Sequence, residues 1–301
     1  MAHRVTGAAL VFELFGHDAL ANDIARRCAV ARGRLLLRRF PDGESYLRYA
    51  DDVAGRHVVL ACNLARPDPH IPALIFAAAT AKELGASKVT LVAPYLPYMR
   101  QDHRFSSGEA VTSRIFARML CAHIDALVTV DPHLHRYNAL ETIYTVPTRI
   151  AASDPAMAAW IRAHVPDAFV LGPDAESEQW VKAVAELAGV PWCVSRKTRN
   201  GDRDVEVSVP DLTRWRDRTP VILDDIISSG QTMSVAVRHV RAVHRAAPVC
   251  VAVHAVFAND AHDALLAAGA AVVVTTDTLP HPTNAISIAP LLAATLQPLL
   301  A

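Results

Sequence analysis

Two adjacent acids, Asp224 and Asp225, stand where an apolar run of the sequence gives way to a short polar loop and then a helix. The loop and the following helical turn supply hydroxyls and a flexible backbone at Ser228, Ser229, Gly230 and Thr232. Hydroxyls and backbone N–H groups at a helix N-terminus are suited to wrapping a phosphate. The acids can accept hydrogen bonds from sugar hydroxyls, directly or through a metal ion. An ordinary strand–turn–helix is the alternative, but it would leave adjacent acids at a buried strand end without a local cation.

Cationic side chains gather on two other polar segments. The first contains Arg100, Gln101, Asp102, His103 and Arg104, whose positive and hydrogen-bonding groups suit a polyphosphate. The second contains Lys197 and Arg199, next to an Asn-Gly pair that is typical of a tight hairpin turn. Both segments can also be interpreted as solvated loops, and the residues alone leave that choice open.

Candidate metal ligands follow two further strand-like runs. His133 lies two residues after Asp131, and an acid beside a histidine can orient the ring towards a metal ion. A lone histidine is more often only hydrogen-bonded, and Mg²⁺ prefers oxygen ligands. Asp174 precedes a helix, where it can help to hold Mg²⁺ or simply favour the helix dipole.

The scaffold that must bring these residues together is visible in the apolar pattern, in which short runs rich in Val, Ile and Leu alternate with longer Ala-rich segments. The expected strands are 8–14, 35–40, 57–62, 88–93, 127–131, 168–172, 221–224, 249–256 and 271–275. The expected helices are 18–31, 71–84, 110–121, 176–188, 232–246 and 261–268, three of them ending at Gly85, Gly189 and Gly269. This alternation predicts an α/β fold of mainly parallel sheets covered by helices on both faces, with ligands beyond the carboxyl ends of the strands.

The length of 301 residues favours two domains, and the strand–helix pattern occurs twice. Pro147 and Pro155 mark the best boundary. The expected division is an N-terminal domain at 1–148, a C-terminal domain at 149–287, and a final helix at 288–301 that can return to the first domain.

Composition narrows the function classes. Lys+Arg and Asp+Glu are 30 each, so there is no basic excess for nucleic acid or an anionic membrane, whereas small anionic ligands need only local charge. The five cysteines form no C-x-x-C pair and are expected to be small buried side chains in a reducing compartment. The first residues do not have the pattern of a signal peptide, and no apolar run is long enough to span a bilayer, which predicts a cytoplasmic protein.

The segment from Asp224 to Thr232 resembles the phosphoribosyl diphosphate (PRPP) binding motif of the type I phosphoribosyltransferase fold. Other segments resemble one family with that fold, the ribose-phosphate diphosphokinases, or PRPP synthetases. These are Arg39-Phe40-Pro41-Asp42-Gly43-Glu44, the Pro-Tyr-x-x-x-x-Arg-Gln-Asp string ending at Asp102, the Asp-x-His string ending at His133, and the Lys-x-Arg pair at Lys197 and Arg199. On the residues alone, the Pro-Asp-Gly string is simply a turn. The motifs occur in the family's order over nearly the whole chain. Two strings, Asp-Ile-Ile-Ser-Ser-Gly at 225–230 and Arg-Gln-Asp-His-Arg-Phe at 100–105, look more like the archaeal-type branch of the family than the common bacterial one.

The resemblance implies two type I phosphoribosyltransferase-like domains and the transfer of a diphosphoryl group from ATP to ribose 5-phosphate, which gives PRPP and AMP. It implies the following roles: ATP binding by Phe40, Asp42, Glu44, Arg100, Gln101, Asp102 and His103; ribose 5-phosphate binding by Asp224, Asp225, Ser228, Ser229, Gly230 and Thr232; Mg²⁺ binding by His133 and Asp174; and transition-state stabilisation by Lys197 and Arg199. A homodimer or larger assembly is implied because the family's adenine site is shared between subunits. Glu176 and Ser177 depart from the family's usual glycines after the aspartate. A phosphoribosyltransferase that consumes PRPP and a non-catalytic regulatory subunit are the alternatives.

Overall fold

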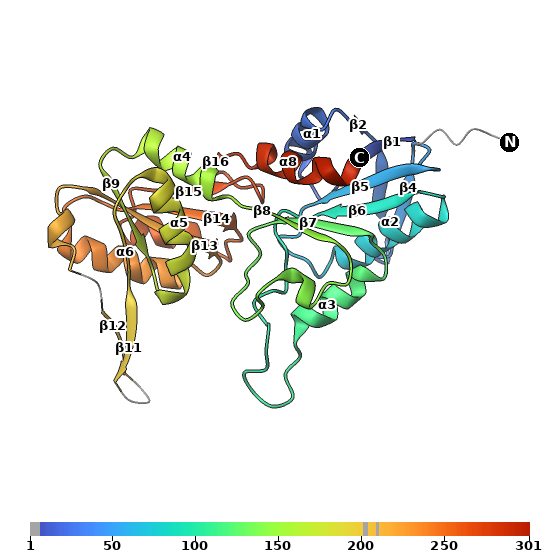
Figure 1. Ribbon diagram of the computed structural model, residues 1–301. Helices are drawn as coiled ribbons and strands as arrows, with labels where there is room; N and C mark the ends of the chain where they lie inside the picture. Colours follow the sequence, from blue (N-terminus) through green and yellow to red (C-terminus); the bar gives the residue numbers. More distant parts are fainter. Residues whose placement is uncertain (1–6, 201–203, 209–210) are drawn as a thin grey trace. The chain divides into compact units, whose positions relative to one another are not determined.

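The computed structural model describes residues 7–200, 204–208 and 211–301, with side chains at 9–195 and 211–301. The chain divides into two compact units: unit 1 is Met1–Ala151 with Ala289–Ala301, and unit 2 is Ala152–Ile288. Each unit is built around its own parallel sheet flanked by helices, so the predicted α/β class is confirmed (Figure 1). The predicted boundary after residue 148 cuts through a strand, Thr148–Ala151, which pairs with the unit 1 sheet.

The sheet of unit 1 has the strand order β2-β1-β5-β6-β7-β8, and all its neighbours are parallel. These strands are β1 (Gly7–Leu14), β2 (Ala31–Arg32), β5 (Arg56–Cys62), β6 (Lys88–Val92), β7 (Ala126–Val130) and β8 (Thr148–Ala151). The helices of this unit are α1 (Asp18–Arg27), α2 (Ile71–Glu83), α3 (Thr112–Cys121) and α8 (Ala289–Leu300). The final helix α8 packs beside α1 and against β7 and β8, so the last residues of the chain complete unit 1 (Figure 1).

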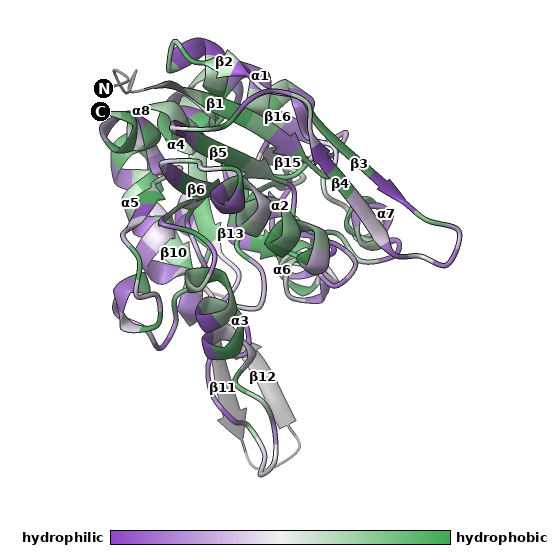
Figure 2. Ribbon diagram, turned by 90° about the vertical axis from the view of Figure 1, so that its right-hand side faces the viewer, coloured by the Kyte–Doolittle hydropathy of each residue, from purple (hydrophilic) through white to green (hydrophobic). Residues whose placement is uncertain are grey.

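Alternation along β1 explains how this sheet is covered on both faces. Leu10, Phe12 and Leu14 point into one core with apolar side chains of α2 and α3, while Val11 between them is buried as well. Because both faces of a parallel sheet are buried, the strands read as continuous apolar runs. Figure 2 shows this for β5, which is hydrophobic along most of its length.

Residues 35–40, predicted as a strand of the parallel sheet, instead belong to a separate antiparallel hairpin. The hairpin is formed by β3 (Leu35–Arg39) and β4 (Ser45–Tyr49). The prediction was wrong because Gly43, with a φ of +94°, allows a tight turn that pairs the run with its immediate successor. The Tyr49 ring packs edge-on against Phe12 at 4.9 Å, which holds this hairpin against the core of unit 1.

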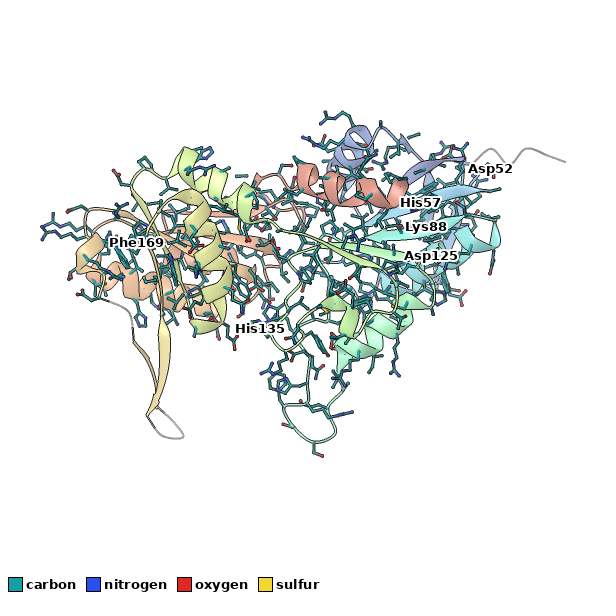
Figure 3. The ribbon with its side chains drawn as sticks, in the orientation of Figure 1. Asp52, His57, Lys88, Asp125, His135 and Phe169 are labelled. Carbon is teal, nitrogen blue, oxygen red and sulfur yellow. The ribbon has the colours of Figure 1, made fainter. Side chains whose placement is uncertain are left out.

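The sheet of unit 2 has the order β10-β9-β13-β14-β15-β16 and is also parallel. Its strands are β9 (Ala168–Gly172), β10 (Trp192–Val194), β13 (Thr219–Ile227), β14 (Val249–Ala255), β15 (Val272–Thr276) and β16 (Asn284–Ile286). Its helices are α4 (Asp154–His164), α5 (Glu178–Ala188), α6 (Gln231–Val243) and α7 (Ala261–Ala267), and β11 (Arg196–Asn200) pairs with β12 (Asp204–Ser208) as a hairpin. In the core beneath α6, the ring of Phe169 stacks on that of Trp215 at 5.1 Å. Figure 3 shows the position of Phe169.

Several short elements were not predicted. Helix α4 begins at Asp154, at the end of the stretch assigned to the domain boundary, and β2, β8, β10 and β16 have two to four residues each. Runs this short carry too little periodicity to be recognised. The predicted glycine caps are confirmed, because Gly85, Gly189 and Gly269 have φ values of +87°, +70° and +108°. Within the described residues, no helix is long and apolar enough to cross a membrane.

Both sheets reverse their winding direction at one point. In unit 1 the chain passes from β1 outwards to β2 and from β5 in the opposite direction to β6. In unit 2 it passes from β9 to β10 and from β13 the other way to β14. Crevices outside the carboxyl ends of strands at such reversals are where open α/β sheets bind ligands. The positions to inspect are therefore the ends of β1 and β5, and of β9 and β13.

His57 lies at the opposite, amino end of the unit 1 sheet, where Figure 3 shows it near Lys88 and Asp125. Its Nε2 atom is 2.8 Å from the Thr90 hydroxyl, and the Lys88 ammonium donates to the Leu299 carbonyl of α8. Burial, and then the positive charge of Lys88, lower the pKa of His57 to about 4, although Asp125 opposes the shift. The folded protein therefore holds this imidazole in its neutral form.

This histidine should make the stability of unit 1 pH-dependent. The unfolded chain binds a proton at His57 near its ordinary pKa and the folded chain only near 4, so the free energy of unfolding falls as the pH drops between about 6.5 and 4. The expected loss is on the order of 3 kcal/mol. Urea unfolding at several pH values measures it, and His57→Gln should remove most of this dependence. The control His164→Gln, at an exposed position on α4, should keep it. Equal pH profiles for parent and His57→Gln would contradict the prediction.

Candidate substrate site

Three acids gather at the carboxyl ends of β9 and β13, where unit 2 reverses its winding. Leu171 of β9 pairs with Ile222 of β13, so Asp174 after β9 lies at the same end as Asp224 and Asp225. β13 extends to Ile227, so both acids lie inside the strand, whereas the predicted strand 221–224 ended at Asp224. Burial, then the negative charges of Asp225 and Asp174, raise the pKa of Asp224 well above its usual value. The cluster therefore concentrates negative charge in a half-buried place.

Such a cluster is suited to a positively charged or hydroxyl-rich ligand. Binding a divalent cation would relieve the repulsion that raises the pKa of Asp224. All three side chains offer carboxylate oxygens, the ligand type that Mg²⁺ prefers. The residues present therefore fit a magnesium ion, and they equally fit hydroxyl groups that donate hydrogen bonds.

Asp174 is held by a turn that explains one departure from the family pattern. Its carboxylate accepts from the backbone N–H groups of Glu176 at 3.1 Å and Ser177 at 3.3 Å. The Ser177 hydroxyl donates to the Asp174 carbonyl at 2.6 Å and fills the space that a β-carbon at Gly172 would need. Ser177 thus uses its hydroxyl to define the turn, and residue 172 has to be glycine beside it.

The polar loop after β13 leads into the N-terminus of α6. Gly230 has a φ of +70°, and a β-carbon there would lie 3.4 Å from Ala261 of α7, so both conformation and space favour glycine. The Gly230 carbonyl accepts from Ser234 at 2.8 Å, which starts the helix. Ser229 and Thr232 are exposed at this N-terminus. Exposed hydroxyls beside the positive end of a helix form a phosphate-binding arrangement.

A second loop supports the polar loop and was missed by the sequence reasoning. The N–H groups of Phe257 and Ala258 donate to the carbonyls of Ile227 and Ser228 at 2.9 and 3.0 Å. The segment 256–258 therefore fixes the backbone from which Ser228 and Ser229 project. Its only signal in the sequence is its position after a buried strand, β14, next to β13 in the sheet.

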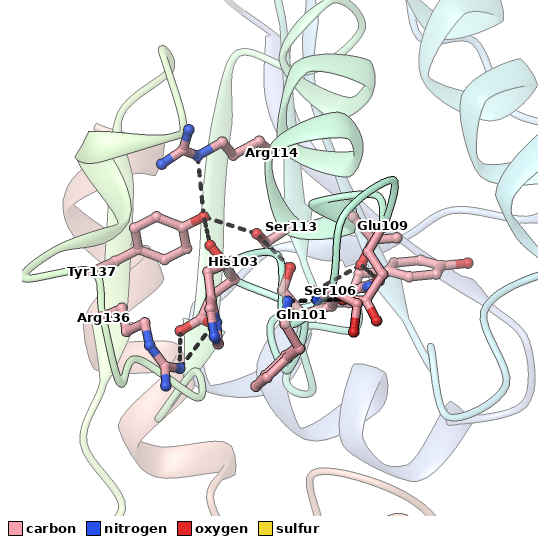
Figure 4. A network of polar contacts seen from close by, with 12 residues as sticks. Gln101, His103, Ser106, Glu109, Ser113, Arg114, Arg136 and Tyr137 are labelled. Atoms are coloured by element: carbon pink, nitrogen blue, oxygen red, sulfur yellow. Dashed lines mark hydrogen bonds and ion pairs between the residues drawn. The ribbon is translucent and has the colours of Figure 1, made fainter.

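In unit 1, the predicted polyphosphate residues lie on the loop that follows β6. Arg100 is exposed, and the Gln101 side chain accepts from the Thr112 hydroxyl at 3.2 Å. Asp102 differs from them, because its side chain is only 3% exposed and pairs with His103 and Arg136 (Figure 4). The loop is thereby tied to the segment after β7, the neighbouring strand, which includes His133. The structure thus brings Arg100–His103 and His133 to neighbouring strand ends.

His133 is packed against a second histidine. Its ring centroid is 3.8 Å from that of His135, and the Nε2 atom of His135 lies 3.2 Å from the Nδ1 atom of His133. One ring must donate in this contact and the other accept, so His135 selects the tautomer of His133. This gives His135, which had no predicted role, a part in orienting the candidate metal ligand.

The predicted adenine-binding residues lie on the β3–β4 hairpin. The Phe40 ring is 40% exposed, and the Arg38 guanidinium lies 4.6 Å above its centroid. The Asp42 carboxylate accepts from the Glu44 N–H at 3.1 Å within the turn, so part of its role is structural. An exposed aromatic ring stiffened by a stacked cation offers a surface for a planar ligand.

The remaining predicted residues, Lys197 and Arg199, have side chains outside the described set. Their backbone forms β11, in which Lys197 pairs with Val207 and Arg199 with Val205 of β12. Residues 201–203, which link the two strands, also lie outside the described residues.

The strand reversal of unit 1 is occupied by the protein's own groups. Glu13 accepts from the backbone N–H groups of Gly16 and His17, and the Asn63 amide donates to the Phe15 carbonyl at 3.1 Å. Phe15 in turn stacks on His70 at 4.1 Å. These donors and acceptors satisfy one another, in contrast to the clustered acids at the reversal of unit 2.

The combination of a parallel sheet, clustered acids and a polar helix-start loop at the reversal defines unit 2 as a type I phosphoribosyltransferase domain. Comparison with known proteins agrees: residues 141–289 match the phosphoribosyl transferase domain, and residues 9–123 match the N-terminal domain of ribose phosphate pyrophosphokinase. The chain is 33% identical over 261 residues to a ribose-phosphate pyrophosphokinase of Methanopyrus kandleri, covering 86% of this chain and 88% of that protein. It is 34% identical to the one of Methanothermobacter thermautotrophicus over 85% of this chain and 88% of that protein.

A solved structure, the phosphoribosylpyrophosphate synthetase of Mycobacterium smegmatis, matches with a TM-score of 0.85 at 26% identity and covers 97% of this chain and 99% of that one. The chain belongs to the ribose-phosphate pyrophosphokinase family, which confirms the resemblance predicted from the motifs. The two archaeal relatives also agree with the predicted likeness to the archaeal-type branch.

Proposed function

We propose that this protein transfers the diphosphoryl group of ATP to the anomeric hydroxyl of ribose 5-phosphate, which gives PRPP and AMP. The observation that carries the proposal is the cluster of Asp174, Asp224 and Asp225 beside the Ser228–Gly230 loop, at the strand reversal of unit 2. The acids suit the hydroxyls of a sugar, and the loop suits its 5-phosphate. The names of three relatives of this chain, each a ribose-phosphate pyrophosphokinase, support the same reaction.

In this reaction the anomeric hydroxyl gives up its proton to solvent and its oxygen forms a bond to the β-phosphorus. The bond from that phosphorus to the α–β bridging oxygen breaks, and the electron pair leaves with AMP. Little covalent chemistry is left for the protein, so positioning and charge stabilisation do most of the work. The polar loop and Thr232 would hold the 5-phosphate, and Asp224 and Asp225 would orient the ring hydroxyls. Lys197 and Arg199 would stabilise the negative charge of the moving diphosphoryl group.

For ATP, we propose that Phe40 stacks on adenine while Asp42 and Glu44 accept hydrogen bonds from its amino edge. Arg100, Gln101 and His103 would contact the phosphates. Support comes from the exposure of the Phe40 ring, directly after β3, and of Arg100, in the loop after β6. Asp102 is the exception, because its carboxylate is buried and already paired.

Magnesium is the metal that the donor set suits. In unit 2, Asp174, with Asp224 and Asp225 near it, offers carboxylate oxygens. In unit 1, His133 is a separate candidate metal ligand. When bound, the ion would neutralise negative charge on the phosphate oxygens. The protein's own contribution is to fix the Asp174 carboxylate in its turn and to set the tautomer of His133 through His135.

We also propose a homodimer or larger assembly. The β3–β4 hairpin exposes Leu36, Leu37 and Phe40, and Phe76 on α2 is 48% exposed. α2 packs against β4, so these apolar side chains belong to neighbouring elements of one unit. Contact with a second copy would remove this apolar surface from water.

The nucleotide product distinguishes the proposal from its rivals. With ATP, ribose 5-phosphate and Mg²⁺, the purified protein should form AMP and PRPP in equal amounts, and omission of the sugar should stop AMP release. Chromatography of the nucleotides measures both. ADP as the first product would indicate an ordinary kinase, and diphosphate released from added PRPP with a base would indicate a phosphoribosyltransferase. A protein that binds both substrates without turnover would be the regulatory subunit.

A further inference from the structure

The loop after β6 and the loop after β7 are joined by a polar network centred on Asp102. Figure 4 shows its labelled members His103, Arg136, Tyr137 and Ser113. The Asp102 carboxylate accepts from the Arg136 guanidinium at 3.0 and 3.3 Å and pairs with His103 Nδ1 at 2.8 Å. Its side chain is 3% exposed, whereas that of Arg136 is 52% exposed. A carboxylate this deeply buried and already paired has little surface left for a substrate.

Tyr137 ties the backbone of the same loop. Its hydroxyl donates to the Asp102 carbonyl at 3.0 Å and lies 2.9 Å from the Ser113 hydroxyl. Ser113, in the first turn of α3, also donates through its hydroxyl to the Gln101 carbonyl at 3.1 Å. The peptide units of Gln101 and Asp102 are therefore clamped between the start of α3 and the segment after β7.

At neutral pH the negative charge of Asp102 maintains its interactions with Arg136 and His103. Burial alone would raise the pKa of Asp102, but the hydrogen bond from His103 and the positive charge of Arg136 together lower it below its ordinary value. Asp102 therefore stays ionised, and loss of Arg136 would leave a buried carboxylate with one partner fewer. Hydrogen bonds to charged groups and buried charges without partners carry larger free-energy differences than neutral surface contacts.

We propose that Asp102 is a positioning residue: through Arg136 and Tyr137 it fixes Gln101 and its neighbours against the His133 segment, ready for the phosphates of ATP. The inference rests on the proposed function, because it assumes that this loop binds ATP. It replaces the direct nucleotide contact first expected of Asp102. It also gives Arg136 and Tyr137, which no motif singled out, a defined role in nucleotide binding.

A double-mutant cycle with Asp102→Asn and Arg136→Met tests the proposal. Each single change should raise the KM for ATP, and the calorimetric Kd for ATP, by roughly tenfold, while the KM for ribose 5-phosphate stays within about twofold. If Asp102 acts only through Arg136, the double variant should bind ATP with about the affinity of whichever single variant binds ATP more weakly. If Asp102 touches the nucleotide itself, the two losses multiply, and that result overturns the proposal.

Conservative variants separate positioning from general stability. Arg136→Lys keeps the positive charge and should recover most of the ATP affinity. Tyr137→Phe keeps the buried ring, removes only the hydroxyl, and should also weaken ATP selectively. Arg118→Met is the matched control and should behave as the parent, because Arg118 is exposed on α3, the helix that also contains Ser113. Thermal unfolding is measured for every variant.

Two further outcomes count against the proposal: parental ATP affinity in both single variants, or equal losses for ATP and ribose 5-phosphate. Should Asp102→Asn fail to fold, the remaining variants still test the proposal. Arg136→Met is then compared with Arg136→Lys, and Tyr137→Phe with the parent, by the KM for ATP and the KM for ribose 5-phosphate. Failure of the proposed function shows itself differently, because then the parent protein binds no ATP or releases no AMP.

Discussion

Lys197→Ala is expected to fold normally, to bind MgATP nearly as the parent does, and to lose at least about two orders of magnitude in turnover. The reason is that a charge donor directed at the moving diphosphoryl group acts mainly in the transition state, and removal of one such donor commonly costs about 100- to 1000-fold. Steady-state AMP formation and calorimetric ATP binding measure the two effects. Arg216→Ala, an exposed cation of unit 2 with 81% of its side chain accessible, is the control. Near-parental turnover of the Lys197 variant would contradict the proposed role.

The same variant tests whether the ATP site is shared between subunits. Mixed oligomers of Lys197→Ala and Asp42→Ala, each nearly inactive alone, should regain part of the activity if the hairpin of one copy serves the other. No recovery in verified mixed oligomers would place all these residues in one subunit's site.

Asp224→Asn is expected to change activity and stability in opposite directions. The carboxylate should be needed for ribose 5-phosphate, so we expect a loss of about 100-fold in kcat/KM for the sugar, with little change in ATP affinity. The fold should become more stable, because the variant no longer has the like charges of Asp174 and Asp225 facing a third carboxylate. Asp217→Asn, at a side chain that is 90% exposed, should alter neither property. A destabilised Asp224→Asn protein would contradict the charge-cluster interpretation.

The pH dependence of that gain follows from the direction of the pKa shift. The folded pKa of Asp224 is raised above its unfolded value, so the folded state binds the proton more tightly. Its ionisation therefore costs stability as the pH rises from the unfolded pKa through the folded one. The advantage of Asp224→Asn over the parent should be absent in strong acid and complete above the folded pKa. Added Mg²⁺ should raise the unfolding temperature of the parent more than that of the variant.

The sequence predicted the parts of the site that depend on one local pattern. An apolar strand, two acids, small residues and a helix follow one another within Val221–Thr232, and strand order in a parallel sheet then brings Asp174 to the same end. The β3–β4 hairpin was missed, because its apolar residues resemble a buried strand and only the turn at Gly43 reveals antiparallel pairing. Sequence patterns report local periodicity, whereas pairing partners depend on turns and on tertiary contacts.

The role of Asp102 shows a different limit. Its place in the string Arg-Gln-Asp suggested a ligand contact, yet its burial depends on Arg136, Tyr137 and Ser113, which come from two later segments of the chain. No spacing rule connects residue 102 to residue 136, because the two meet only when β6 and β7 pair. Whether a charged residue of a motif faces solvent or an internal partner is decided by such tertiary contacts.

The return of α8 to unit 1 has a consequence for synthesis on the ribosome. Residues 152–288 form one continuous unit that can fold as soon as it emerges, whereas unit 1 lacks its final helix until the whole chain has been made. At usual elongation rates this interval lasts roughly seven to thirty seconds, during which the apolar surface that α8 later covers stays exposed. Ile24, Ala25 and Cys28 of the α1 segment are buried in the finished protein, and the Cys28 thiol contacts the Ala293 carbonyl of α8. Unit 1, although synthesised first, is therefore the unit that matures last and has the greater need of chaperones during translation.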